Sequence, residues 1–70
     1  MKQLSHLKLN GVLYEYKQPL SLKNMLEYLG FNAEIILLDY NGIIIPRSRW
    51  GKIILRSDDQ IEVLTLAGGG

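Results

Sequence analysis

The residues of this sequence that are best suited to chemistry lie at its end, in the stretch Leu66-Ala67-Gly68-Gly69-Gly70. Three successive glycines offer no side chain to pack and cost conformational entropy to order, so they are predicted to form a thin, mobile thread. A carboxylate at the end of such a thread can enter a narrow pocket that a folded surface cannot reach. The alternative is a linker remnant or a frayed terminus, and the rest of the chain must decide between the two.

Other groups that commonly perform catalysis are scarce. The chain has no cysteine, which excludes disulfides, thiol catalysis and cysteine-ligated zinc. Its single histidine, His6, cannot form a metal site alone, and no constellation of partners makes it catalytic. No convergent pair of carboxylates is evident either. We therefore expect a protein without catalytic residues and without a bound metal or cofactor of its own.

Length and composition indicate one small domain. A hydrophobic content of 47% in 70 residues is enough to attempt a core. The net charge is +1 and the basic residues are scattered, which argues against a nucleic-acid partner. The longest apolar run, Ile35 to Leu38, is too short to cross a membrane. We expect a monomer located in the cytoplasm, or in the plastid stroma if the gene is organelle-encoded.

An opening hairpin is predicted around Asn10-Gly11, because this pair favours a two-residue turn in which both residues have positive φ. Residues 4–9 and 12–16 are its strands, with Leu9 opposite Val12 and Leu7 opposite Tyr14. One face is then formed by Leu7, Leu9, Val12, Tyr14 and Tyr16. On the other face, His6 lies opposite Glu15 as a solvated pair.

A short amphipathic helix is predicted over residues 21–29. Ser21 is a good N-cap, and Gly30 suits the left-handed position that ends helices. The apolar stripe at helical spacing is taken as core and consists of Leu22, Met25, Leu26 and Leu29. A helix this short needs a sheet to lie on.

The middle of the chain predicts two more strands. The run Ile35 to Leu38 is typical of a strand buried on both faces, and hence central in the sheet. Asn41-Gly42 predicts a second hairpin, and Pro46 makes its partner strand, residues 43–45, short or peripheral. Trp50 is expected to cover one end of the core with its N–H near water. Residues 52–56 are ambiguous between strand and loop.

The last strand, residues 61–66, leads into the glycines. If Ile61 and Val63 point at the helix, Leu64 and Leu66 lie on the outer face, where an exposed apolar patch often marks a partner surface. The alternative is that the connection 47–56 covers them. A right-handed crossover brings the third or the last strand beside the first. The element order thus predicts an α+β domain over residues 1–67, a β-grasp (ubiquitin-like) roll with a mixed sheet of four to five strands and one main helix.

The chain resembles the ThiS-type sulfur carriers of thiamine biosynthesis. The most specific likeness is the stretch from Asn41 to Trp50, which is similar to the NG-x-x-x-PR-x-x-W block of that family. The opening hairpin, the helix closed by Gly30 and the terminal glycines also correspond. One departure is Asp58-Asp59-Gln60, where the family more often has Asp-Gly-Asp; we expect it to alter the turn and not the chemistry.

The resemblance implies a sulfur-carrying role for Gly70, with Gly68 and Gly69 as a flexible tail, residues 68–70, that enters a partner's pocket. Gly70 would be adenylated by a ThiF-type adenylating enzyme that uses ATP and magnesium, and then converted to a thiocarboxylate with sulfur from a cysteine desulfurase system. A ThiG-type thiazole synthase would receive the sulfur. The protein is then a co-substrate and not an enzyme, with Leu64, Leu66, Arg47 and Arg49 as candidate partner contacts.

Three other interpretations remain open. The first is a related carrier of the molybdopterin-synthase small-subunit type, which shares the fold and the glycine end. The second is a ubiquitin-like modifier joined to lysines through Gly70. The third is a β-grasp interaction module whose glycines carry no function. For Arg47 and Arg49, solvated arginines without a partner are the alternative.

Overall fold

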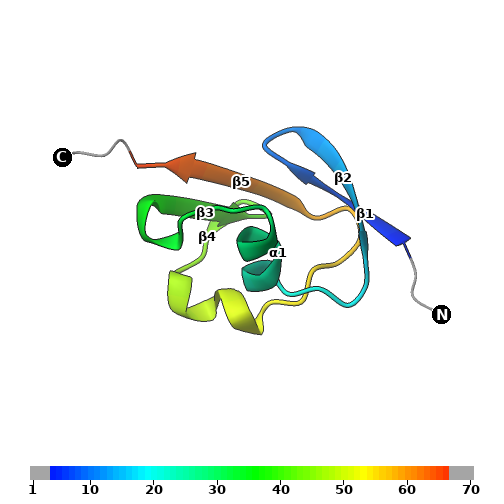
Figure 1. Ribbon diagram of the computed structural model, residues 1–70. Helices are drawn as coiled ribbons and strands as arrows, with labels where there is room; N and C mark the ends of the chain where they lie inside the picture. Colours follow the sequence, from blue (N-terminus) through cyan, green and yellow to red (C-terminus); the bar gives the residue numbers. More distant parts are fainter. Residues whose placement is uncertain (1–3, 67–70) are drawn as a thin grey trace.

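The computed structural model describes residues 4–66 and contains a five-stranded sheet with one α-helix and two short 3₁₀ helices (Figure 1). The elements are β1 (Leu4–Leu9), β2 (Val12–Lys17), α1 (Leu22–Tyr28), η1 (Ala33–Ile35), β3 (Ile36–Tyr40), β4 (Ile43–Ile44), η2 (Arg47–Lys52) and β5 (Gln60–Thr65). The strand order is β2-β1-β5-β3-β4. Only β1 and β5 pair in parallel among these strands of residues 4–66, so the sheet is mixed. The predicted β-grasp fold is confirmed; the predicted domain boundary at residue 67 lies outside the described residues.

Both predicted hairpins are present with the expected turn geometry. Asn10 and Gly11 have φ of 51° and 80°, and Asn41 and Gly42 have φ of 52° and 91°. The first hairpin has the predicted register, with Leu7 opposite Tyr14. β4 is a two-residue edge strand, as the following proline predicts. These features follow from local sequence, because a pair of residues that tolerates positive φ closes a two-residue turn.

The face predicted for the first hairpin is buried only in part. Leu7, Leu9 and Tyr16 belong to the core, whereas Val12 and Tyr14 on the same face are exposed. Val12 and Tyr14 belong to the edge strand β2, on which Tyr16 is the one buried residue. Period two correctly predicted which side chains share a face, but it does not say how far the helix covers that face.

Helix α1 has the predicted N-cap, Ser21, and is one residue shorter at each end than the predicted helix, residues 21–29. The Ser21 hydroxyl accepts a hydrogen bond from the Asn24 backbone N–H at 3.1 Å, and Gly30 has φ of +84°. Leu22, Met25 and Leu26 are buried, as predicted. The prediction that Leu29 belongs to the core is wrong: it is the C-cap residue and is 38% exposed, because the helix ends before this position turns onto the sheet.

The prediction that the run from Ile35 to Leu38 forms the central strand is also wrong. Ile35 belongs to η1, and β3 lies next to the edge strand β4. The centre of the sheet is β5, which inserts between β1 and β3. In β3 burial alternates, with Leu38 buried and Leu37 41% exposed, because α1 covers one face of the sheet. A continuous apolar run therefore does not mean burial on both sides here.

The connection from β4 to β5 closes the core. Trp50 in η2 is 3% exposed and its Nε1–H donates a hydrogen bond to the Ile45 carbonyl at 2.9 Å. The prediction that this N–H lies near water is therefore wrong. Of the ambiguous segment 52–56, Lys52 ends η2, and the remainder forms one bridge between Ser21 and Ile54, with Leu55 buried in the core. Neither α1 nor either 3₁₀ helix is long and apolar enough to cross a bilayer, among residues 4–66.

Candidate functional site

The strand that leads to the glycines is held on both of its edges. β5 pairs with β1 on one side and with β3 on the other (Figure 1). The β3 ladder continues to Thr65, opposite Ile36, and the Leu66 N–H then donates to the Ile35 carbonyl at 2.6 Å. The backbone is thus hydrogen-bonded as far as Leu66. The candidate tail residues Gly68, Gly69 and Gly70 lie outside the described residues.

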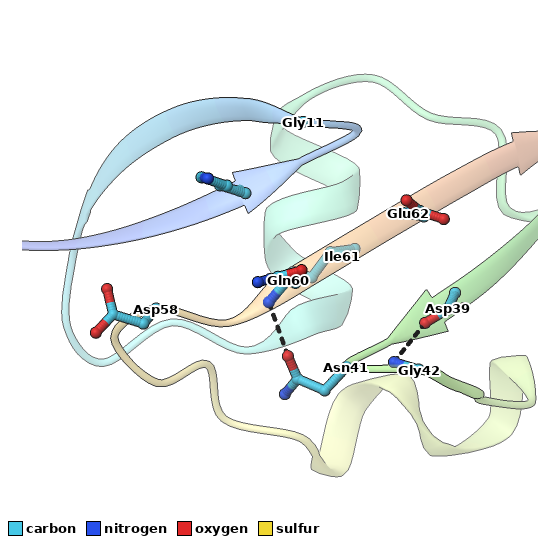
Figure 2. Close-up of a pocket in the computed structure, with 9 residues that line it drawn as sticks. Gly11, Asp39, Asn41, Gly42, Asp58, Gln60, Ile61 and Glu62 are labelled. Atoms are coloured by element: carbon cyan, nitrogen blue, oxygen red, sulfur yellow. Dashed lines mark hydrogen bonds between the residues drawn. The ribbon is translucent and has the colours of Figure 1, made fainter.

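The asparagines of the two turns bind β5 with their side chains. The Asn10 amide accepts from the Val63 N–H at 2.7 Å and donates to the Val63 carbonyl at 3.3 Å. On the opposite edge, Asn41 Oδ1 accepts from the Gln60 N–H at 2.7 Å, and the Asn41 N–H donates to the Gln60 carbonyl at 2.8 Å (Figure 2). Each asparagine side chain thus binds a backbone group of β5 beyond the end of the neighbouring strand. The sequence predicted that these asparagines form turns, but it did not predict that their side chains bind the backbone of β5.

Asp59 organises the entry to β5 and was not identified from the sequence. Its side chain is buried, at 6% exposure. The carboxylate accepts hydrogen bonds from the Tyr40 hydroxyl at 2.7 Å, the Arg56 N–H at 2.7 Å and Asn41 Nδ2 at 3.1 Å. Burial, followed by the hydrogen bond to Asp59, raises the pKa of Tyr40 to about 12. The sequence signal was the departure from the family's usual turn at residues 58–60, for which the expectation was an altered turn and unchanged chemistry.

The outer face of the sheet carries an apolar patch beside the end of β5. We call Leu37, Ile44 and Leu64 the sheet patch; Leu37 lies directly opposite Leu64, and the three side chains are 41–58% exposed. Leu66 is 46% exposed at the end of the same strand. The predicted outward facing of Leu64 and Leu66 is confirmed, and the alternative that residues 47–56 cover them is excluded. An exposed cluster of this kind is typical of a partner surface.

Carboxylates border the sheet patch on the side away from Leu66. Asp39 lies directly opposite Glu62 on adjacent strands, and Asp39 also lies opposite Ile44. These two carboxylates line a hollow of about 550 Å³ between the two turns, together with Lys8, Asn41 and Gln60 (Figure 2). The Asp39 carboxylate accepts from the Gly42 N–H at 2.7 Å, which supports the turn. Within residues 4–66, no group of three or more His, Cys, Asp or Glu side chains is arranged to hold a metal ion.

The remaining candidate residues lie apart from the sheet patch. Arg47 and Arg49 are exposed on η2, and Arg47 borders α1, which covers the opposite face of the sheet. The structure therefore does not bring the arginines and Leu64 together. His6 Nε2 is 3.3 Å from Glu15 Oε2 and both side chains are about half exposed, as predicted for a solvated pair.

Comparisons with known proteins place this arrangement in a family. The ThiS family profile matches residues 7–70. The chain has a TM-score of 0.79 and 25% identity with the crystal structure of the thiamine biosynthesis protein ThiS from Geobacter metallireducens, covering 93% of this chain and 99% of that one.

Three similar sequences extend the comparison. The uncharacterized protein ycf40 of Trieres chinensis is 36% identical over 62 residues, 89% of this chain and 85% of the relative. Its counterpart in Pyropia yezoensis is 34% identical over 64 residues, 91% and 90%. A thiazole synthase of Magnetococcus marinus is 36% identical over 62 residues, which make up 89% of this chain and 19% of the relative. With the family match spanning most of the sequence, the chain belongs to the ThiS family, the ubiquitin-like sulfur carriers of thiamine biosynthesis.

Proposed function

We propose that this protein carries sulfur as a thiocarboxylate on Gly70 and supplies it for the thiazole moiety of thiamine. The observation that carries this proposal is the family match, which continues through Gly70. The structure supports it with a central strand, β5, whose backbone is hydrogen-bonded up to Leu66, four residues before Gly70 in the sequence. A rigid strand followed by small residues presents a carboxylate to a narrow pocket.

The chemistry needs activation because an oxide is a poor leaving group. A carboxylate oxygen of Gly70 attacks the α-phosphorus of ATP and releases pyrophosphate, which leaves an acyl-adenylate. The terminal sulfur of a persulfide then attacks the carbonyl carbon, AMP departs, and an acyl disulfide remains. A second thiol cleaves that disulfide, so that the carrier keeps the sulfur as a thiocarboxylate and the two thiols are joined as a disulfide. The anionic sulfur is nucleophilic at neutral pH.

The catalytic groups for these steps belong to the partners. We propose a ThiF-type adenylating enzyme that uses ATP and magnesium, a cysteine desulfurase as the sulfur source, and a thiazole synthase as the acceptor. The thiazole synthase from Magnetococcus marinus supports the last of these, since a segment similar to this chain forms 19% of that protein. This chain acts as a co-substrate: it contains no cysteine and a single histidine, which is half exposed beside Glu15.

The sheet patch is the proposed docking surface on the sheet side. Leu64 and Leu66 are exposed and lie four and two residues before Gly68 in the sequence, so a partner that receives the glycines lies close to both side chains. Burying two such leucines contributes about 2 kcal/mol or more to association. Arg47 and Arg49 are proposed to contact an acidic surface of a partner on the helix side.

An intact-mass experiment tests the proposal. The protein is incubated with ATP, magnesium, the adenylating enzyme and a cysteine desulfurase with its cysteine substrate. A mass increase matching the replacement of one oxygen by sulfur is expected, and it should disappear when ATP is omitted. A variant that lacks Gly70 should neither gain this mass nor support thiazole formation. If that variant supports thiazole formation as well as the wild type does, Gly70 is not the sulfur carrier.

A further inference from the structure

A groove between α1 and η2 combines basic and apolar side chains on the helix side of the molecule. It encloses about 720 Å³. Lys23 and Glu27 line it from α1, and Arg47 and Lys52 line it from η2. We infer that this basic groove binds an acidic protein segment of an enzyme that loads or unloads the carrier. The inference rests on the proposed function, because it gives the helix side a partner of defined chemistry.

The charge balance of the basic groove is the first argument. Three cations line it and Glu27 is the single carboxylate among its lining residues in the described part of the chain. Among residues 4–66, no carboxylate lies within 4.0 Å of the charged groups of these three side chains, and the groove carries more positive than negative side chains. An excess of positive charge held on two packed elements favours a partner of opposite sign.

The groove also has an apolar wall and a close contact that positions one cation. Phe31, Pro46 and Trp50 line it. The Lys23 side chain passes over Gly51, with its Cδ 3.6 Å from the place a Cβ would occupy on that glycine. The stem of Lys23 is therefore packed while the residue as a whole stays exposed. These features fit a segment that carries acidic residues together with an apolar side chain.

The place of the groove in the fold links it to the glycine end of the chain. Ala33 lines the groove, and Ile35 at the end of the same 3₁₀ helix accepts the hydrogen bond from Leu66. The groove is formed with α1, on the opposite side of the sheet from the sheet patch. The carrier therefore offers a partner enzyme the basic groove on the helix side of the sheet and the sheet patch on the other side.

The test measures binding of each enzyme to charge variants of the groove. A Lys23→Glu/Arg47→Glu/Lys52→Glu variant and a neutral variant with glutamine at the same positions are compared with the wild type, using the adenylating enzyme and the thiazole synthase separately as probes. The three side chains are exposed, so both variants should fold, which circular dichroism and thermal unfolding check. Lys17→Glu, an exposed change on β2 and away from the groove, serves as the charge control.

The expected result is at least about tenfold weaker binding of one or both enzymes by the glutamate variant, with a smaller loss for the glutamine variant. The wild-type affinity should fall with added salt more steeply than that of the glutamine variant, because screening acts on charges that the variant lacks. Unchanged affinity of both variants for both enzymes, or an equal loss with Lys17→Glu, overturns the inference. Failure of the wild type to gain sulfur would instead refute the proposed function, and the binding comparison would still decide on the groove.

Discussion

The substitution Asn10→Gly separates the two roles of this asparagine. Glycine adopts the φ of 51° at this position without strain, so the turn itself is preserved. The variant loses both hydrogen bonds between the Asn10 amide and the Val63 backbone, at 2.7 and 3.3 Å. A net loss of about 0.5–1.5 kcal/mol for each bond gives about 1–3 kcal/mol. The greater freedom of glycine in the unfolded chain adds a further cost of about 0.5 kcal/mol.

The assay is reversible unfolding by urea or heat, followed by circular dichroism. A loss of about 2 kcal/mol in a domain of this size lowers the melting temperature by roughly 8–16 °C. Asn24→Gly is the matched control, since it makes the same chemical change at an exposed helix position whose side chain makes none of the hydrogen bonds found within residues 4–66. That control should lose about 0.5 kcal/mol.

A second variant tests the hydrogen-bond explanation itself. Asn10→Asp also tolerates positive φ and keeps the acceptor for the Val63 N–H, but it places a second oxygen opposite the Val63 carbonyl. It should therefore be less stable than the wild type at neutral pH. If Asn10→Gly loses no more than Asn24→Gly does, and Asn10→Asp is as stable as the wild type, the side-chain contacts to β5 do not stabilise the fold and the reasoning is refuted.

Three further predictions concern single side chains. The pKa of Tyr40 is raised from its ordinary 10.0 to about 12 in the folded state. The stability that neutral Tyr40 contributes is therefore present below pH 10 and is lost as the pH rises toward 12. Denaturation at several pH values should show a smaller loss of folding stability over this range in Tyr40→Phe than in the wild type. Tyr16→Phe should be neutral or stabilising by up to about 1 kcal/mol, since this buried hydroxyl has no hydrogen-bond partner among residues 4–66, and a melting temperature lowered by several degrees would contradict this. Leu64→Glu should leave the melting temperature within about 2 °C of the wild type and weaken binding of the adenylating enzyme or the thiazole synthase at least about tenfold, whereas unfolding would show that Leu64 is needed for the core.

The family assignment came from the sequence because its signals are spread along the chain and have fixed spacing. The block from Asn41 to Trp50 and the glycine end together indicated the ThiS family, which the family match supports. The carrier role of Gly70 stays a prediction. The structure completes two surfaces on opposite sides of the sheet that the sequence indicated only in part. Leu37 and Ile44 join Leu64 in the sheet patch, and Lys23 and Lys52 join Arg47 in the basic groove.

Local sequence patterns specify the short-range features of the fold. Both turns, the N-cap at Ser21 and the facing of the first hairpin follow from backbone preferences and from side-chain periods of two and 3.6 residues, which act within a few positions. Such signals contain no information about distant neighbours, which is why the run from Ile35 to Leu38 was placed at the centre of the sheet.

Which strand is central, and what surrounds it, depends on pairing between distant parts of the chain. β5 lies between β1 and β3 because the chain returns through η2 to pair with both, and no local pattern encodes that return. The same holds for Asp59, whose burial depends on donors from Tyr40 and Asn41, 18 or 19 positions away. Asn10 meets Val63 across 53 positions. The strand that leads to the glycines is thus held by contacts between residues far apart in the sequence, whereas the glycines themselves can be identified from the sequence alone.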